Sequence, residues 1–206
     1  NSKTDTNREE WKHLLRDKKP NRYQMYHPLI ADDGKLLFQS NSPLVKIDFC
    51  GNLLWINDTD RFHHANEIDH EGNYWVPSII FPYQVDEELV GVQYGENNYT
   101  DEGITKISPD GKILYEKSVT EIFIENGYKH LIFGQINDFS DTIHLNDIQP
   151  IFKDGLYWKK GDVILSMRSM SLIMHFRPST NKIIHILTGP FYKQHDVDII
   201  SDKEIS

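Results

Sequence analysis

The sequence is poor in cysteine, in long apolar runs and in positive charge. Cys50 is its only cysteine, which excludes an intrachain disulfide. Its apolar runs, such as 163–165, are far too short to cross a bilayer, and the N-terminus shows no signal peptide. A net charge of −9 argues against nucleic acid as a partner, because phosphate binding requires a basic face. Any anion site must therefore be a local exception on an acidic surface.

Hydrophobic residues make up 38% of the chain and aromatic residues 12%, so the 206 residues can form one well-buried domain. Residues 1–24 differ from the rest because they are polar and charged. Within them Thr6 and Glu9 fit a capping box and Pro20 ends the run, which predicts a short amphipathic helix; a frayed tail is the alternative. We therefore divide the chain into an N-terminal segment over 1–24 and a β domain over 25–206.

The β domain reads as short strands separated by turn residues such as Asp33-Gly34 and Asp110-Gly111. One hairpin layout, in which a tight turn joins an apolar strand to a return strand rich in Ile, Leu and aromatics, recurs over 46–56, 106–116 and 175–187. The sequence therefore predicts the same hairpin three times.

A second repeated unit precedes these hairpins and begins at a histidine. It begins at His27, His64, His144 and His195, at spacings of 37, 80 and 51 residues. A unit of about forty residues that contains two hairpins is typical of a β-propeller blade. The longer spacings are then explained by insertions over 81–98 and by a helix predicted over 118–127. Ser118 would cap the start of that helix, and Gly127 would end it.

The sequence thus predicts an all-β protein, a β-propeller of four-stranded blades with a short N-terminal helix. About three blades and a partial one fit into the chain, whereas closed propellers have about four to eight. We favour a fragment of a larger ring, because the repeat that His195 begins is cut at Ser206. A homo-oligomer whose copies close the ring together is the alternative.

The innermost strands of a propeller line one central channel, so equivalent positions of successive blades meet at one mouth. A single histidine near a turn is more often a surface or structural residue, but His64, His144 and His195 stand at equivalent repeat positions. We therefore predict that these three form a site. His27 is a weaker candidate because Pro28 follows it. The remaining histidines are interpreted as surface or packing residues: His13, His70, His130, His175 and His185.

Four motifs in this part of the chain are specific as a set: HHANEIDHEGNYWV, DTIHLND, the S-x-R-x-x-S core of VILSMRSMSLIMHF, and QHD. Together they resemble the arylsulfotransferase family of bacterial β-propellers, from about His63 to the C-terminus. The resemblance implies transfer of a sulfuryl group from a small aryl sulfate to a phenol, without a nucleotide sulfate donor or another cofactor. One departure is Thr142-Ile143, where family sequences usually carry an aromatic residue before the histidine.

The resemblance also implies roles for single residues. His195 would be the nucleophile that forms a transient sulfohistidine in a ping-pong mechanism. His144 and Arg168 would hold the sulfuryl oxygens, and His64 would complete the pocket. Elementary chemistry agrees, because a neutral imidazole is a competent nucleophile and fixed donors stabilise charge on the equatorial oxygens. A protonated His64 or His144 would donate a proton to the leaving phenolate.

Further residues around this set are predicted to bind the substrate: Asn146, Ser166, Ser169 and His63. Asn146 lies two positions beyond His144 on the same strand face, and the two serines flank Arg168. His63 adjoins His64 but points to the opposite face by strand alternation, so it is the weaker member. Candidates for an aryl pocket are Tyr94, Tyr99, Phe191 and Tyr192.

Two other functions stay open at this point. A propeller of this kind could bind partners without turnover. Three convergent histidines could also hold Zn²⁺ with an open position, although Arg168 would repel a cation and no carboxylate belongs to the repeat position. The resemblance alone implies a periplasmic, secreted or membrane-anchored location.

Overall fold

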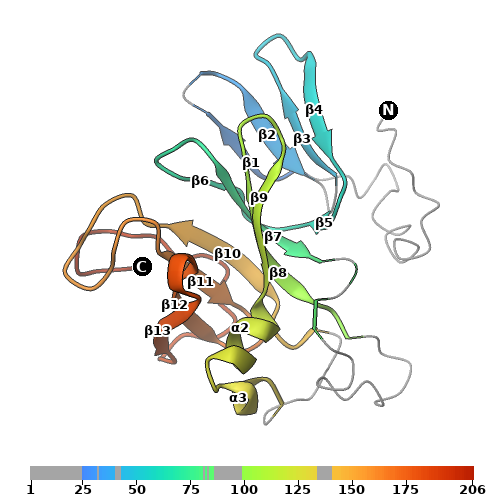
Figure 1. The fold of residues 1–206 in the computed structure, drawn as a ribbon. Coiled ribbons are helices and arrows are strands. Elements are labelled where there is room, and N and C mark those ends of the chain that lie inside the picture. The colour runs from blue at the N-terminus through green and yellow to red at the C-terminus, as the bar shows by residue number, and fades with distance from the viewer. Residues whose placement is uncertain are drawn as a thin grey trace.

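The computed structural model describes residues 25–206 except 32, 40–42, 81, 83, 86–98 and 134–140. The helix predicted within residues 1–24, most of the insertion predicted over 81–98, and Tyr94 lie outside the described residues. The described part folds into three antiparallel sheets, which follow one another along the chain and fan out around β7 and β10 (Figure 1).

Each sheet is one blade, and its strands pair in the order in which they occur in the sequence. Blade 1 consists of β1 (Tyr26–Ile30), β2 (Leu36–Gln39), β3 (Leu44–Ile47) and β4 (Leu53–Asn57). Blade 2 has an inner strand in two pieces, β5 (Arg61–Phe62) and β6 (Glu67–Ile68), followed by β7 (Tyr74–Ile79), β8 (Glu102–Ile107) and β9 (Ile113–Ser118). Blade 3 consists of β10 (Leu145–Pro150), β11 (Val163–Met167), β12 (Leu172–Arg177) and β13 (Lys182–Leu187). The predicted β-propeller architecture of four-stranded blades is confirmed.

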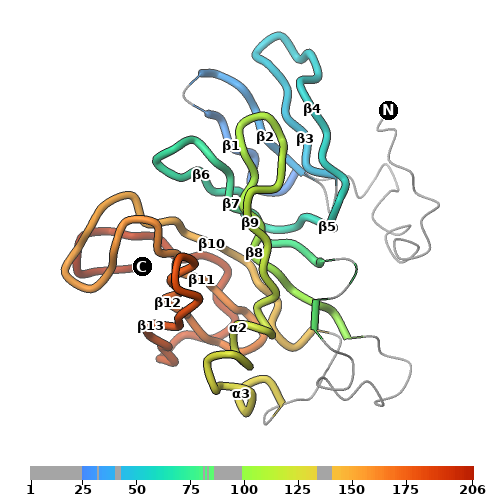
Figure 2. Tube along the Cα trace, in the orientation of Figure 1, coloured from blue at the N-terminus to red at the C-terminus, as the bar shows by residue number. Residues whose placement is uncertain are grey.

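The chain continues past blade 3 into the position predicted for a partial blade. There it forms one further antiparallel bridge, between Ile199 and Ile205. The trace in Figure 2 shows that this last segment returns beside blade 3, and that the three sheets do not close into a ring.

The three predicted hairpins are all present, as β3–β4, β8–β9 and β12–β13. In the first two, Gly51 and Gly111 have φ angles of 84° and 88°, which cost glycine nothing because it has no Cβ. The N–H of Gly111 donates to the carbonyl of Ser108 at 2.9 Å, and the strand register shifts beside it, as in a turn that ends in a bulge. The third hairpin reaches the same left-handed conformation with Asn181, whose φ is 54°.

Apolar faces between neighbouring blades hold the inner strands in register. The strands β11 and β12 are buried along nearly their whole length, whereas the outer strand β13 is largely exposed or half-buried. The core between blades 2 and 3 contains, among others, Trp75, Ile104, Phe123, Leu145, Ile148, Leu165 and Met174. The core between blades 1 and 2 contains Leu37, Leu44, Phe62, Tyr74, Val76 and Ile107. Because strands between two blades face apolar neighbours on both sides, their sequences are apolar on both faces.

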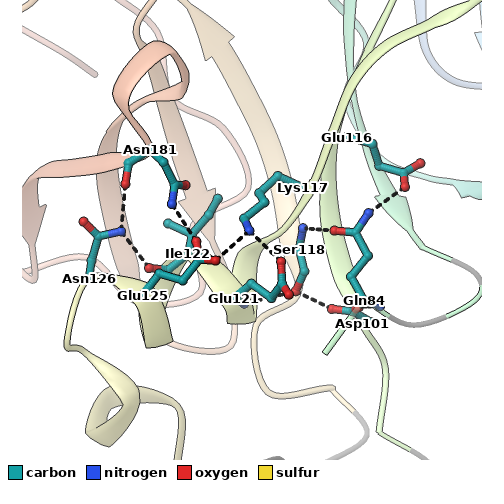
Figure 3. Close-up of polar contacts among 10 residues, drawn as sticks. All are labelled: Gln84, Asp101, Glu116, Lys117, Ser118, Glu121, Ile122, Glu125, Asn126 and Asn181. Atoms are coloured by element: carbon teal, nitrogen blue, oxygen red, sulfur yellow. Dashed lines mark hydrogen bonds and ion pairs between the residues drawn. The ribbon is translucent and has the colours of Figure 1, made fainter. Parts of the chain in front are cut away.

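The helix predicted over 118–127 is also present, as α2 (Val119–Glu125), and α3 (Lys129–Phe133) follows it. Ser118 caps α2, since its Oγ accepts a hydrogen bond from the Glu121 N–H at 3.1 Å. The same Oγ donates to Asp101 at 2.6 Å, and the Asn126 amide donates to the Asn181 carbonyl at 3.1 Å (Figure 3). The helix therefore links the outer edge of blade 2 to the outer edge of blade 3.

Candidate active site

The inner strand of each blade is irregular where its histidine stands. Residues 63–66 interrupt the inner strand of blade 2, and the register of β1 and of β10 shifts next to His27 and His144. The φ angles of His27, His64 and His144 are positive, at 38°, 57° and 50°. Such φ values are uncommon for residues other than glycine, and bulges in strands redirect side chains. His27, His64 and His144 thus share a backbone conformation as well as a sequence position, whereas His195 shares only the sequence position.

This conformation brings histidines of different blades together. The ring centroids of His64 and His144 lie 4.9 Å apart, and those of His64 and His195 lie 6.3 Å apart. Arg168 lies in the turn after β11, and its backbone N–H donates to the His144 carbonyl at 3.0 Å. The positive charge of Arg168 lowers the pKa of His195, in addition to the larger effect of burial. The four residues predicted to be catalytic therefore form one cluster.

Two histidines of the cluster, His64 and His195, have lowered pKa values that favour the uncharged ring. Burial, together with the neighbouring histidines, His63 first and then His144, lowers the pKa of His64 to about 2. The pKa of His195 is lowered by burial first and then by Arg168 and His144. A neutral His195 retains the lone pair that a nucleophile needs. A pKa of about 2 argues against a protonated His64 as the proton donor, and the other donor named in that prediction, a protonated His144, stays a prediction.

His27 also belongs to this neighbourhood. Its charge contributes to lowering the pKa of both His64 and His195, although its contribution is a minor one. His27 was predicted to be a weaker candidate because Pro28 follows it. The positive φ that it shares with His64 and His144 was not visible in the sequence.

Asp141 is a site residue that the sequence analysis missed. Both of its carboxylate oxygens face His144 Nδ1, at 2.7 and 2.8 Å. Nδ1 therefore donates to the carboxylate, and Nε2 is the nitrogen that can reach a substrate. Ser169, predicted to bind the substrate, is exposed and donates from Oγ to Asp141 at 3.5 Å. The D-x-x-H spacing of the DTIHLND motif was the available signal for Asp141.

His63 and Glu102 form a second carboxylate–histidine pair behind His64. The Nδ1 atoms of His63 and His64 lie 2.7 Å apart, so one of them carries a shared hydrogen. On the other side of the ring, His63 Nε2 lies 3.0 Å from Glu102 Oε2, too far off the N–H direction for a regular hydrogen bond. Both side chains are buried. His63 was predicted to bind the substrate, but the structure places it behind His64; no local pattern links it to Glu102 on β8.

Side-chain amides tie the neighbouring histidine segments to one another. Asn146 Nδ2 donates to the Gln194 carbonyl at 3.1 Å, and Gln194 Nε2 donates to the carbonyls of blade 3 at residues 167 and 172. In the same way, Asn66 Nδ2 donates to the His27 carbonyl at 2.7 Å. Asn146 is almost fully buried, so in this structure it orients the residue before His195.

For the other predicted binding residues, the structure shows packing and pairing contacts within the blades and the C-terminal segment. Ser166 is fully buried on β11, opposite Asp147 on β10. Tyr99 is buried and packs with Val85. Phe191 packs against a third core cluster, and the exposed Tyr192 lies under the ammonium group of Lys193. Substrate contacts of these residues stay predictions.

Two carboxyl groups on the inner strands, the half-buried Glu67 on β6 and the buried Asp147 on β10, have raised pKa values. Burial, together with the charges of Glu67 and Asp196, raises the pKa of Asp147 to about 8. The pKa of Glu67 is raised to about 7 by burial and by the charges of Asp196 and Asp198. At neutral pH the carboxyl group of Asp147 is therefore mostly protonated.

The metal hypothesis finds no geometric support among the described residues, since no group of three or more His, Cys, Asp or Glu side chains there could hold a metal ion. Within the same ranges, no helix has the length and apolar character needed to cross a membrane.

Comparison with protein families identifies the chain. The model of the arylsulfotransferase (ASST) family matches residues 27–206. The chain belongs to the arylsulfotransferase family. The match covers all three blades of this arylsulfotransferase-family protein, together with His64, His144, Arg168 and His195. Comparison with curated proteins found no match.

Solved structures similar to this arylsulfotransferase-family chain include a protein of unknown function from Bacteroides caccae, with a TM-score of 0.50, 13% identity, and coverage of 81% of this chain and 46% of the other. A catalytically inactive virginiamycin B lyase from Staphylococcus aureus, solved with quinupristin, has a TM-score of 0.37, 14% identity and coverage of 86% and 60%. A streptogramin B lyase has a TM-score of 0.38, 12% identity and coverage of 86% and 58%. The chain thus spans less than two thirds of the length of each of these structures.

Proposed function

We propose that this protein transfers a sulfuryl group from an aryl sulfate to a phenol, with His195 as the nucleophile. The observation that carries the proposal is the meeting of three repeat histidines, with His64 in ring contact with His144 at 4.9 Å and facing His195 at 6.3 Å. Arg168 adds a fixed positive charge beside His195. A cation and imidazole groups around one point suit the anionic sulfuryl group.

In the first half-reaction, the lone pair of neutral His195 attacks the sulfur of the donor. The bond between sulfur and the aryl oxygen breaks, and the phenolate leaves with the electron pair of that bond. The product on the protein is a sulfohistidine. The lowered pKa of His195, caused by burial and then by Arg168, keeps this lone pair free near neutral pH.

Arg168 and His144 hold the sulfuryl oxygens in this proposal. Asp141 stabilises the imidazolium form of His144 through Nδ1, so that Nε2–H can donate to an oxygen of the transferring group. In the second half-reaction the acceptor phenol attacks the sulfur and loses its proton to the site. The bond between sulfur and the His195 nitrogen breaks, its electron pair returns to that nitrogen, and the new aryl sulfate leaves.

The test is transfer from 4-nitrophenyl sulfate to a phenol acceptor, followed by nitrophenol absorbance and by the mass of the sulfated product. We expect His195→Ala to lower the rate by about a thousandfold or more, as for loss of other nucleophiles. His130→Ala is the matched control, because His130 is exposed on α3 outside the cluster. If the folded wild-type protein transfers no sulfuryl group from a panel of aryl sulfates, the proposal fails and a binding role replaces it.

The proposed location outside the cytoplasm, in the periplasm, secreted or membrane-anchored, rests on family likeness. It is tested by fractionating the source cells with an antibody to the protein. Recovery of the protein in the cytosolic fraction alone would contradict it.

A further inference from the structure

Proton supply at His64 poses a problem that the proposed transfer must solve. A departing phenolate takes up a proton, and His64 faces the site from blade 2. Yet burial holds the pKa of His64 at about 2, so its ring carries a single proton. A neutral imidazole that gives away its only proton becomes an anion, which is unfavourable unless the other ring nitrogen gains a proton at the same time.

The contacts of His64 provide such a second proton. Its Nδ1 lies 2.7 Å from Nδ1 of His63, so Nε2 is the nitrogen left to face the site. Behind it, His63 Nε2 lies 3.0 Å from Glu102 Oε2 in a buried environment, where the carboxylate stabilises an imidazolium. That Glu102 oxygen has no hydrogen-bond partner in the described part of the chain, which leaves its charge available to His63.

We propose that Glu102, His63 and His64 form a proton relay that serves the leaving phenolate and the incoming phenol. The inference rests on the proposed function and deepens it. His63 and Glu102 act through His64 and are positioning residues, whereas His64 meets the substrate.

The protons of the relay balance over one cycle. In the proposed relay, both nitrogens of His63 and Nε2 of His64 carry protons before transfer. When the phenolate leaves, His64 Nε2 gives it that proton and Nδ1 takes the proton of His63 Nδ1. His63 is then neutral, with its remaining proton on Nε2 toward Glu102. In the second half-reaction, the acceptor phenol gives its proton to His64 Nε2, and the shift runs backward.

The relay thus switches His64 between two tautomers, a donor before the first transfer and an acceptor before the second. The titratable groups that face the pair are Glu102 from β8, His144 from blade 3, His195, and His27 from blade 1. Glu102 supplies the negative charge among them. Its replacement by glutamine keeps the shape of the side chain and removes the charge.

The kinetic test compares donors with different leaving groups in single-turnover release of phenol. Phenyl sulfate loses a basic phenolate that needs a proton, whereas 4-nitrophenyl sulfate loses a stable one. We expect Glu102→Gln and His63→Gln to lower the rate of phenol release from phenyl sulfate by about a hundredfold. The rate of release from 4-nitrophenyl sulfate should fall far less. The control is His175→Gln, because His175 is buried with its Nε2 2.8 Å from Asp162, away from the site. Equal losses for both donors would overturn the relay and indicate a structural role.

A second measurement does not depend on activity. Nitrogen-15 NMR of the histidine rings in the full chain reports which nitrogen of His64 carries the proton. At neutral pH we expect Nε2–H in the wild type and Nδ1–H in Glu102→Gln, because neutral His63 then accepts from His64. An unchanged His64 tautomer in Glu102→Gln would overturn the relay even if the protein transfers sulfuryl groups. The expected change of tautomer in a protein without transferase activity would instead refute only the proposed function.

Discussion

Asp141 holds His144 Nδ1 between both of its carboxylate oxygens, at distances of 2.7 and 2.8 Å. The two residues are three positions apart, where the chain enters β10, and Arg168 is attached to the same segment through its backbone bond to the His144 carbonyl. A histidine held at Nδ1 has a defined ring orientation and presents Nε2. This pair fixes the half of the site that blade 3 contributes.

Replacement of Asp141 by asparagine keeps the shape of the pair and removes its charge. Hydrogen bonds to charged groups contribute about 1.5–3 kcal/mol, which corresponds to about a ten- to hundredfold change in an equilibrium or a rate. We expect Asp141→Asn to lower kcat/KM for aryl sulfates by that factor while the melting temperature changes little. The Ser169→Ala variant serves as comparison, because Ser169 contacts Asp141 only at 3.5 Å. A wild-type rate for Asp141→Asn would show that the pair plays no part in turnover.

The buried carboxyl of Asp147 makes stability depend on pH. Its pKa is raised by burial to about 8, above its value in the unfolded chain. The native state therefore holds a proton that the unfolded state releases, and stability is lost as the pH rises toward about 8. Asp147→Asn cannot ionise, so we expect it to melt several degrees above the wild type near pH 9 and to differ less near pH 5.

Asp162 provides a control of opposite sign. Burial acts to raise its pKa, but the hydrogen bonds from Arg177 and from the Lys159 N–H outweigh burial, and the pKa lies below its usual value. We expect Asp162→Asn to destabilise the protein at neutral and alkaline pH, since the ionised form is the stabilised one. Parallel melting curves against pH for the wild type and Asp147→Asn would contradict the assignment of the buried proton.

The amide of Asn146 connects blade 3 to the segment that carries His195. Asn146→Asp replaces a donor by a carboxylate that faces the Gln194 carbonyl, and a buried group left without its partner costs about 1–3 kcal/mol. We expect that loss in urea unfolding, together with a lower rate of sulfuryl transfer. Asn66→Asp removes the equivalent hydrogen bond to the His27 carbonyl. It should lower the stability by a similar amount and the rate of sulfuryl transfer by less. If Asn146→Asp unfolds like the wild type, the tie to Gln194 does not hold the segment.

The repeats were predictable because their signals are local. Turn residues such as Gly111, the cap at Ser118, and the apolar runs between them depend on neighbours a few positions away, and these signals located the hairpins, α2 and the blades. The equivalent places of His64, His144 and His195 followed from the repeats. Repetition of a local pattern was therefore enough to determine the architecture and to name the histidines that meet.

The chemistry of the site was decided by the tertiary structure. Strand alternation placed His63 on the face opposite His64, but a left-handed residue and an interrupted strand put both rings in contact, with Glu102 of β8 behind them. The same packing makes His64 neutral, because burial and neighbouring histidines act on it together. The pairing of side chains across strands, the orientation of the rings and the pKa values depend on how the blades pack against each other. The spacing of residues along the chain does not contain that information. The sequence by itself determined which histidines repeat and meet, because repeats are local patterns; only the tertiary structure determined how their rings lie, which carboxylates they face and how burial shifts their pKa values.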